Sequence, residues 1–189
     1  MARFTNQAQL RYGRSIANSN IAVGEILEVL SAAKEAVRNT YRQNDTITYV
    51  ISIVNAGTLA YTGLTITDNL GAYPYNTTTL VPLDYMEGTA KYYINGVLQP
   101  APAATAGPPL VVSGITVPAG GSVTVAYEAA VNEFAPLDTT SVINNTAIVA
   151  GTGITPITAE EEITVESTPV LTITKSVSPV PVTENGTLT

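Results

Sequence analysis

The apolar and polar residues of this chain alternate with a period of two along much of its length. Apolar, β-branched and aromatic side chains are enriched at every second position in five runs, at residues 46–55, 64–68, 91–94, 123–127 and 171–174. Successive side chains of a β-strand point to opposite faces, so this alternation is typical of strands with one buried face. We therefore predict a β-strand in each run.

Turn-forming residues separate these runs and leave little room for helices. Gly, Pro and Asn gather at residues 55–57, 95–96, 118–121 and 151–153. The pair Asn95-Gly96 predicts a tight hairpin, since both residue types accept the positive φ angles of a type I′ turn. Many short strands separated by turns predict an all-β protein with an immunoglobulin-like antiparallel β-sandwich.

Two further segments are less regular. Residues 22–38 contain the Glu, Leu and Ala expected of a helix, but they align with residues 163–179, which are β-branched and contain proline. We therefore predict strand for residues 22–38. Residues 101–109 (APAATAGPP) are predicted to be a surface loop.

The chain repeats parts of itself near both ends. Residues 29–48 (VLSAAKEAVRNTYRQNDTIT) align without gaps with residues 170–189 (VLTITKSVSPVPVTENGTLT), and Lys34 falls on Lys175. At the front, the segment FTNQAQL resembles INNTAIV, so that Asn6 falls on Asn145. This arrangement predicts an N-terminal strand arm at 1–28, a whole repeat at 29–167 and the first strands of a second repeat at 168–189.

The composition excludes most catalytic and metal chemistry. The chain has no Cys and no His, which removes Cys/His zinc sites, thiol nucleophiles, Ser-His-Asp triads and haem ligation. We therefore expect no enzyme, no cofactor and no metal site, and no group of residues predicts a small-molecule pocket. No run approaches the roughly 20 apolar residues of a membrane span, and the first residues lack the apolar core of a signal peptide.

Charge is distributed unevenly along the chain. Residues 1–20 carry Arg3, Arg11 and Arg14 without any acid, whereas residues 43–189 carry two Lys against twelve Asp and Glu. One interpretation is a general effect on solubility. The other is that the basic arm of one copy meets the acidic body of another, because complementary potentials orient partners. Nucleic acid is not expected as a partner, since the acidic body would repel phosphate.

Three polar residues fall on strand faces that the alternation turns inward. Lys34 takes the repeat position of Lys175, which continues an apolar series, and both Asp68 and Asn145 share a face with apolar neighbours two residues away. An unpaired charge in an apolar interior costs several kcal/mol. One explanation is a buried ion pair with an amide partner. Another is a register shifted by one residue, which would turn all three side chains to solvent.

The motifs around these residues resemble a known family. They are the strand of Lys34, the segment NDTITYVISIVNAG at 44–57, LTITDNL at 64–70, and Asn145-Thr146-Ala147. They resemble the prokaryotic surface-repeat family called domain of unknown function eleven, whose pattern is a Lys strand, GDTITYTITVTNTG, VTDTLP and a terminal NTA strand. The resemblance covers about residues 29–167 and restarts at 170. Residues 69–71 (NLG) replace the usual Thr-Leu-Pro.

The resemblance implies an autocatalytic cross-link. Members of this family are similar to the collagen-adhesin-type domains of fimbrial proteins, some of which join a strand Lys to a last-strand Asn beside an acid. By that resemblance Lys34 would attack Asn145, and Asp68 would hold and transfer the protons. Asn144, the residue before Asn145, is expected to point outward. The reaction would occur once per molecule.

Two hypotheses for function follow. In the first, the protein is a structural subunit of an extracellular or spore-surface fibre, a homopolymer in which the N-terminal arm donates strands to a neighbouring copy. Asn6 and Lys175 would then mark the corresponding positions of a contact between molecules. In the second, the protein is a stalk or adhesin module that presents a binding surface without polymerising.

Overall fold

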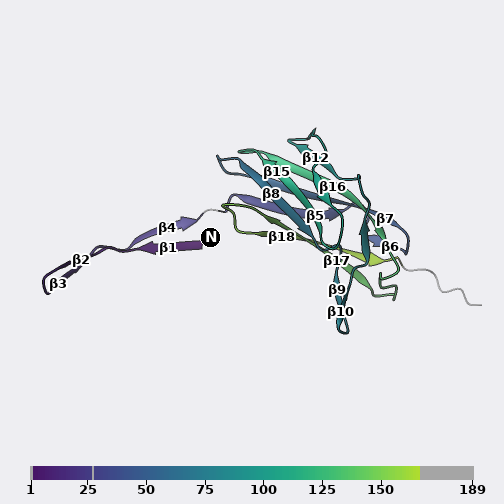
Figure 1. The fold of residues 1–189 in the computed structure, drawn as a ribbon, viewed down its shortest axis with the longest axis horizontal. Helices are drawn as coiled ribbons and strands as arrows, with labels where there is room; N and C mark the ends of the chain where they lie inside the picture. The colour runs from purple at the N-terminus through teal and green to yellow at the C-terminus, as the bar shows by residue number, and fades with distance from the viewer. Residues whose placement is uncertain (1, 27, 167–189) are drawn as a thin grey trace, which may run out of the picture.

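The computed structural model describes residues 2–26 and 28–166, and within them it contains only β-strands and turns. Most strands form a sandwich of two six-stranded sheets (Figure 1). The immunoglobulin-like all-β fold class is thus confirmed. Among the described residues, no helix has the length and hydrophobicity needed to cross a membrane. The predicted strand at 171–174 and the predicted second repeat lie outside the described residues.

The first sheet carries the strand of Lys34 at its edge. Its order is β13 (Val97–Leu98), β12 (Lys91–Ile94), β16 (Ser122–Val131), β7 (Thr46–Asn55) and β5 (Leu30–Ala36), and β11 (Leu83–Tyr85) also pairs with β16. All these pairs are antiparallel. In β7 every second side chain is buried, which is the alternation that predicted the strand.

The second sheet carries Asp68 and Asn145 on neighbouring strands. Its order is β14 (Ala103–Thr105), β15 (Leu110–Val117), β8 (Tyr61–Asp68), β17 (Val142–Ala150), β18 (Ile157–Val165) and β6 (Thr40–Tyr41). Only the short β6–β18 pair is parallel. A small hairpin of β9 (Tyr73–Tyr75) and β10 (Thr78–Leu80) follows β8 and projects from the body (Figure 1).

The core lies between the two sheets, where their inward residues meet. It contains the fully buried Ile, Val, Leu and Tyr side chains of both sheets, including Ile51, Ile66 and Val125. The runs 46–55, 64–68, 91–94 and 123–127 lie in β7, β8, β12 and β16 as predicted. The Asn95-Gly96 turn has φ angles of 48° and 78°, the positive values that a type I′ turn requires.

Two segments differ from the sequence-based prediction. The predicted loop at 101–109 contains β14, which pairs with the outer edge of β15 and so satisfies backbone groups that would otherwise stay open. The prediction of a plain loop is therefore wrong in its centre. Where one strand was predicted at 22–38, the structure has two strands, β4 (Ala22–Ile26) and β5, which belong to different parts of the molecule.

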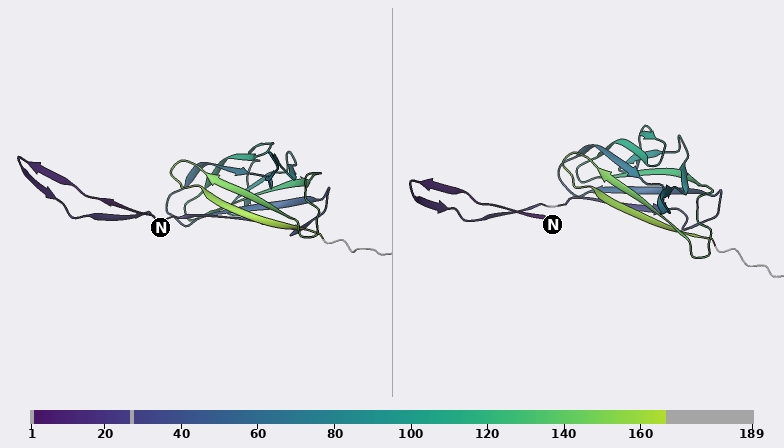
Figure 2. Two further views of the ribbon diagram at one scale, coloured as in Figure 1. Left: turned by 90° about the horizontal axis from the view of Figure 1, so that it is seen from below. Right: turned by 60° about the horizontal axis from the view of Figure 1, so that its bottom comes forward.

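An arm of four strands extends away from the sandwich (Figures 1 and 2). β1 (Ala2–Asn6) pairs with β4, and β2 (Gln9–Tyr12) pairs with β3 (Ser15–Asn18), so the arm is one long hairpin. Every residue from 4 to 23 is exposed. Its large apolar side chains are 56% to 87% exposed: Phe4, Leu10, Tyr12, Ile16, Ile21 and Val23. A lone two-stranded hairpin is marginally stable in water, so the arm has no core of its own.

Asn55 joins two turns at the end of the sandwich. Its side chain is 1% exposed, and its Nδ2 donates hydrogen bonds of 2.8 Å to the carbonyl oxygens of Leu59 and Pro118. Its Oδ1 accepts a hydrogen bond of 2.9 Å from the backbone N–H of Gly57. All polar atoms of this buried amide are therefore engaged in holding backbone turns together.

Substituting this amide should destabilise the sandwich. We expect Asn55→Ala to lower the free energy of unfolding by about 1–3 kcal/mol for each carbonyl oxygen left without a partner. The exposed residue Asn144 provides a control, and Asn144→Ala should change it by less than about 0.5 kcal/mol. Denaturant unfolding measures both. Equal stability of the two variants would contradict the role assigned to Asn55.

Candidate functional site

The three inward polar residues lie together between the two sheets. Lys34 comes from β5 of the first sheet, whereas Asp68 and Asn145 come from β8 and β17 of the second sheet. Their exposed fractions are 4%, 0% and 0%, and Asn144 is exposed. The alternative of a register shifted by one residue is therefore wrong. These are three of the four buried polar or charged residues of the described chain, with Asn55 as the fourth.

A continuous line of hydrogen bonds connects the lysine to the amide. Lys34 Nζ lies 2.7 Å from Asp68 Oδ2, and the Tyr127 hydroxyl donates to the same oxygen at 2.6 Å. Asn145 Nδ2 in turn donates to the Tyr127 oxygen at 3.2 Å. Tyr127 belongs to β16 and is fully buried. Sequence reasoning missed it, although the alternation of its strand already placed it on the inward face.

The turn after β8 binds both the acid and the amide. Leu70 and Gly71 have φ angles of 54° and 73°, which aim successive N–H groups at the site. The Leu70 N–H donates to Asp68 Oδ1 at 3.0 Å, and the Gly71 N–H donates to Asn145 Oδ1 at 3.2 Å. A Cβ at Gly71 would lie 2.5 Å from Ile143. Both the backbone angle and the close packing therefore favour glycine at this position.

Asn69 fixes the strand that carries the amide. Its backbone N–H donates to the carbonyl oxygen of Thr146, and its Oδ1 accepts the N–H of Thr146, both at 2.9 Å. The same Oδ1 also accepts the Gly71 N–H at 2.9 Å. Residues 69–71, which depart from the family pattern, thus hold Asn145 in place beside Asp68.

The burial of Lys34 makes its ammonium easier to deprotonate. Burial lowers the pKa of Lys34 from 10.5 to about 8, and the nearby carboxylates of Asp68 and Glu161 oppose this change by raising it. The ring of Tyr49, whose centroid lies 4.9 Å from Nζ, also favours the charged form. A lysine in this setting releases its proton far more readily than one in water.

Another acid, Glu161 of the run Glu160–Glu162, lies beside the cluster. The three residues lie in the middle of β18, where Glu160 and Glu162 are exposed but Glu161 is half-buried. Glu161 is the cross-strand partner of Asn145. It lies on the inward face because its odd position matches those of the buried Ala159 and Ile163. The alternation of β18 could have placed Glu161 on the inward face, but the run of three acids obscures that alternation.

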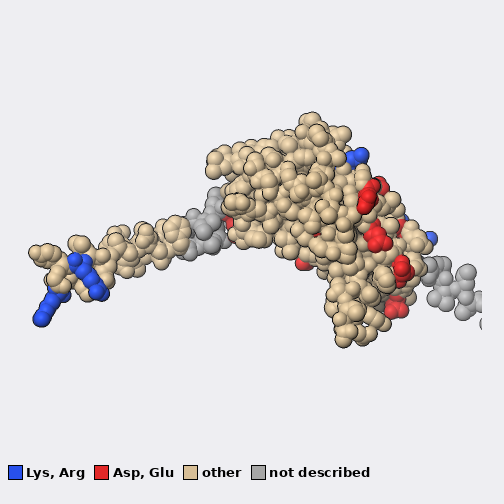
Figure 3. Space-filling view, in the orientation of Figure 1, with Lys and Arg blue, Asp and Glu red and all other residues tan. Residues whose placement is uncertain are grey.

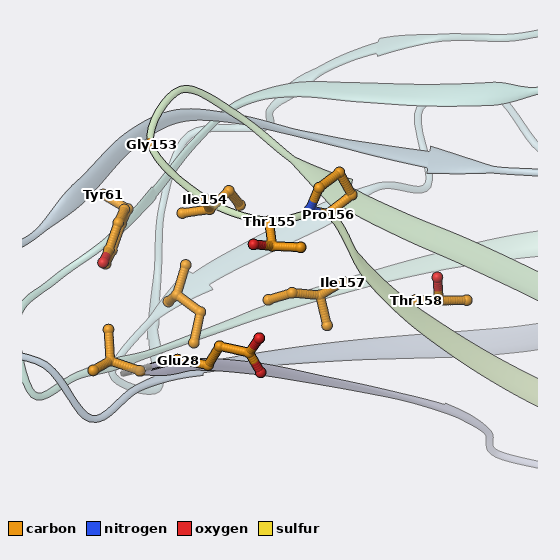
Figure 4. A pocket seen from close by; sticks show the side chains of 10 residues that line it. Glu28, Tyr61, Gly153, Ile154, Thr155, Pro156, Ile157 and Thr158 are labelled. Carbon is orange, nitrogen blue, oxygen red and sulfur yellow. The ribbon is translucent and has the colours of Figure 1, made fainter. Parts of the chain in front are cut away.

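No metal-binding group and no ligand pocket coincides with this cluster. Within residues 2–26 and 28–166, no set of three or more His, Cys, Asp or Glu side chains could hold a metal ion. A pocket of about 320 Å³ lies where the arm joins the body, lined by residues such as Glu28, Tyr61, Ile154 and Ile157 (Figure 4). Lys34, Asp68 and Asn145 do not line it.

Of the two residues predicted to act between molecules, the structure describes Asn6, which is not part of the cluster. Asn6 is exposed in β1, where its backbone partner is Ala22 of β4. Lys175 lies outside the described residues. The structure thus brings together Lys34, Asp68 and Asn145 and leaves Asn6 on the arm.

Comparisons with known proteins support the fold. No protein-family model matches the chain, and no curated protein matches its sequence. Among solved structures, it is similar to the pilus backbone RrgB of Streptococcus pneumoniae, with a TM-score of 0.50, 14% identity, and coverage of 64% of this chain and 31% of that one. It is also similar to a variant of BcpA, the major pilin subunit of Bacillus cereus, with a TM-score of 0.50, 11% identity, and coverage of 86% of this chain and 47% of that one. A third similar structure is the full-length major pilin SpaD of Corynebacterium diphtheriae, with a TM-score of 0.50, 16% identity, and coverage of 70% of this chain and 34% of that one.

These similarities show a pilin-like β-sandwich. The chain spans less than half the length of each of these pilins. At 11% to 16% identity they define the fold alone. The chemistry of the site therefore rests on the residues of this chain.

The lowered pKa of Lys34 predicts a specific pH dependence of stability. Between pH 8 and 10.5 the folded state binds fewer protons at Lys34 than the unfolded chain, so the free energy of unfolding should rise with pH there. We expect this rise from pH 8 to about 10, where exposed tyrosines begin to ionise. The measurement uses the Asn145→Ala variant, in which Lys34 has no amide to react with and can titrate. The control is the double variant Asn145→Ala/Lys34→Met, which lacks the titrating group.

Denaturant unfolding across this pH range checks the prediction. The variant that retains Lys34 should gain stability relative to the Lys34→Met control as the pH rises. Parallel curves for the two proteins would show that Lys34 titrates as an ordinary exposed lysine.

Proposed function

We propose that this protein is a structural subunit of an extracellular or spore-surface fibre, hardened by an isopeptide bond between Lys34 and Asn145. The observation that carries the proposal is the buried line of contacts from Lys34 through Asp68 and Tyr127 to Asn145. A charged lysine in the core is expensive unless it is paired or consumed in a reaction. The pilin-like fold and the similarity of the motifs to the surface-repeat family support the same conclusion.

The residues of the site can carry out the reaction without a cofactor. Lys34 passes a proton to Asp68, 2.7 Å away, and becomes a nucleophilic amine. The amine attacks Cγ of Asn145, a C–N bond forms, and negative charge develops on Oδ1, where the Gly71 N–H already donates. The bond from Cγ to Nδ2 then breaks, and the nitrogen leaves as ammonia. Each molecule reacts once, so the protein is not an enzyme.

The bond would join the two sheets covalently. Lys34 lies on β5, the first strand of the sandwich, and Asn145 lies on β17, which is followed by β18. The acceptor strand is therefore the penultimate strand, and not the last one as the resemblance implies. By analogy with the chain-entropy model for disulfides, closing this loop of about 110 residues would stabilise the fold by roughly 4–5 kcal/mol. Tension along the chain would then load a covalent bond.

Mass spectrometry tests the bond directly. We expect the intact mass of the folded protein to be lower than its sequence mass by one ammonia, and a peptide containing both Lys34 and Asn145 to survive digestion. Lys34→Ala, Asp68→Ala and Asn145→Ala should each restore the full mass. If well-folded wild-type protein has its full sequence mass, no bond has formed, and Lys34 and Asp68 are then a buried ion pair.

The arm is the part of the molecule that we assign to assembly. Residues 4–10 in its first half align with residues 143–149 of β17, and β1 pairs antiparallel with β4 as β17 pairs antiparallel with β18. In the body this hairpin lies between β8 and β6, whereas in the arm it has no flanking strand and its apolar side chains are exposed. The arm thus resembles the end of a repeat whose other strands come from a neighbouring copy.

The charge distribution supports head-to-tail addition. Arg11 and Arg14 lie at the far tip of the arm, and acidic side chains gather at the opposite end of the body (Figure 3). The strand registers and loop hydrogen bonds place Asp45, Asp84 and Asp138 at that end. Complementary ends favour a heterologous contact that propagates into a fibre.

A second repeat starting at residue 170 would be the acceptor of the arm. Its lysine strand would carry Lys175, and the donated strand would carry Asn6 at the position of Asn145. An intermolecular bond between them would also need an acid at the position of Asp68. Strand donation is the main proposal, because it follows from the exposed hairpin itself, and a cross-link from Asn6 to Lys175 is secondary.

Removing the arm tests the assembly. Deletion of residues 1–20 should leave the unfolding of the sandwich unchanged, because its sheets contain no residue before Leu30. The same deletion should abolish filaments seen by electron microscopy. An Arg11→Glu/Arg14→Glu variant keeps the hairpin and should assemble more weakly, with a loss that increased salt diminishes.

Two outcomes would contradict this model. If the truncated protein still forms normal filaments, then the arm is not the donor. If the full-length protein stays monomeric at high concentration, a stalk or adhesin module becomes the better description.

A further inference from the structure

We propose that the hydroxyl of Tyr127 carries a proton from Asp68 to Nδ2 of Asn145, the nitrogen that leaves as ammonia. This inference rests on the isopeptide bond proposed above. It assigns a catalytic role to a residue outside the expected Lys, Asp and Asn set. The Tyr127 hydroxyl lies 2.6 Å from Asp68 Oδ2 and 3.2 Å from Asn145 Nδ2.

The acid and the leaving nitrogen need an intermediary. An amide nitrogen cannot leave as an anion and must gain a proton before the bond from Cγ breaks. Asp68 Oδ2 accepts hydrogen bonds from Lys34 and Tyr127, and Asp68 Oδ1 accepts one from the Leu70 N–H. Among the described residues no hydrogen bond joins Asp68 to Asn145, and Tyr127 is the side chain that contacts both.

The direction of these hydrogen bonds must reverse during the reaction. The nitrogen lone pair of an intact amide is delocalised, so Nδ2 donates to the Tyr127 oxygen. After Lys34 has added to Cγ, the carbon is tetrahedral and Nδ2 has the free lone pair of an amine. Nδ2 then becomes an acceptor, and the Tyr127 O–H, already within reach, becomes its donor.

The proton transfers balance along this line. Asp68, protonated by Lys34, gives its proton to the Tyr127 oxygen while Tyr127 gives its own proton to Nδ2. The Lys34 nitrogen, positive after the attack, then returns one proton to Asp68. The oxyanion at Oδ1 collapses, the bond from Cγ to Nδ2 breaks, and ammonia leaves. The products are the new amide, protonated Asp68, an unchanged Tyr127 and ammonia.

The environment keeps Tyr127 in the form that a relay requires. Burial, and secondarily the charge of Asp68, raises the pKa of Tyr127 well above its usual value. The hydroxyl therefore keeps its proton at neutral pH. A group that is neutral before and after the step can move a proton without storing charge in the core.

Tyr49 offers a matched control in the same cluster. It is the cross-strand partner of Tyr127, and the two rings stack with centroids 5.6 Å apart. Both residues are buried tyrosines on the inward face of the first sheet. The Tyr49 hydroxyl lies near enough to the Asn145 amide to influence the pKa of Tyr49, but it makes no hydrogen bond of normal geometry in the described structure, and none to Asp68. Removing it changes the same chemical group without interrupting the line from Asp68 to Asn145.

The experiment compares the rates of bond formation in Tyr127→Phe, Tyr49→Phe and wild-type protein. Each protein is synthesised in vitro in a short pulse and quenched in acid at timed intervals. Intact mass then gives the fraction that has lost ammonia. A brief protease pulse at each time point gives the folded fraction, to which the rates are referred. We expect Tyr127→Phe to react about 100-fold more slowly and Tyr49→Phe to react at the wild-type rate.

The outcomes separate this inference from the function on which it rests. A wild-type protein that never loses ammonia overturns the isopeptide proposal and the relay with it. A cross-linked wild type together with a Tyr127→Phe variant that reacts equally fast overturns the relay alone. Equal slowing of both Phe variants also overturns it, because the effect would then come from packing of the two rings.

Discussion

Until a bond forms between Lys34 and Asn145, the sandwich depends on one buried pair, the ammonium of Lys34 and the carboxylate of Asp68 between two apolar sheets. Isolated in such a core, either charge would cost several kcal/mol, and each therefore requires the other. The pair is made by opposite sheets, β5 and β8, so their separation and register must suit a contact of 2.7 Å. Replacing one partner leaves the other charge uncompensated, which is more damaging than losing both.

The turn after β8 is organised around this pair. Leu70 adopts a positive φ, which is uncommon for a bulky residue and persists only where the surroundings hold it. Here the Leu70 and Gly71 N–H groups bind Asp68 and Asn145, and Asn69 binds the strand of Asn145. Acid and amide are thus placed by backbone groups, which cannot change rotamer. The proposed reaction would benefit from this preorganisation, because the amine, the acid and the amide are already held close together.

The strands of the body bury their apolar side chains, whereas those of the arm expose them. In the body, two sheets cover each other and enclose a continuous core. In the arm, the same kind of hairpin is present without a second layer, and its apolar residues face solvent. An exposed apolar hairpin is stable when another surface covers it. One chain therefore contains both a packed domain and an uncovered hairpin, and the proposed assembly would cover the hairpin with a neighbouring copy.

The sequence by itself determined the strands and the faces of their side chains. A period of two is a local property, so it located the strand at 46–55 and turned Lys34, Asp68 and Asn145 inward before any contact was known. Local patterns carry no information about which strands become neighbours. β14 was missed because it forms only by pairing with an open edge, and nothing singled out Glu161 because its environment comes from Asn145 on another strand. The position of Tyr127 between Asp68 and Asn145 was decided by the tertiary structure alone, since it depends on two sheets packing face to face with a particular register.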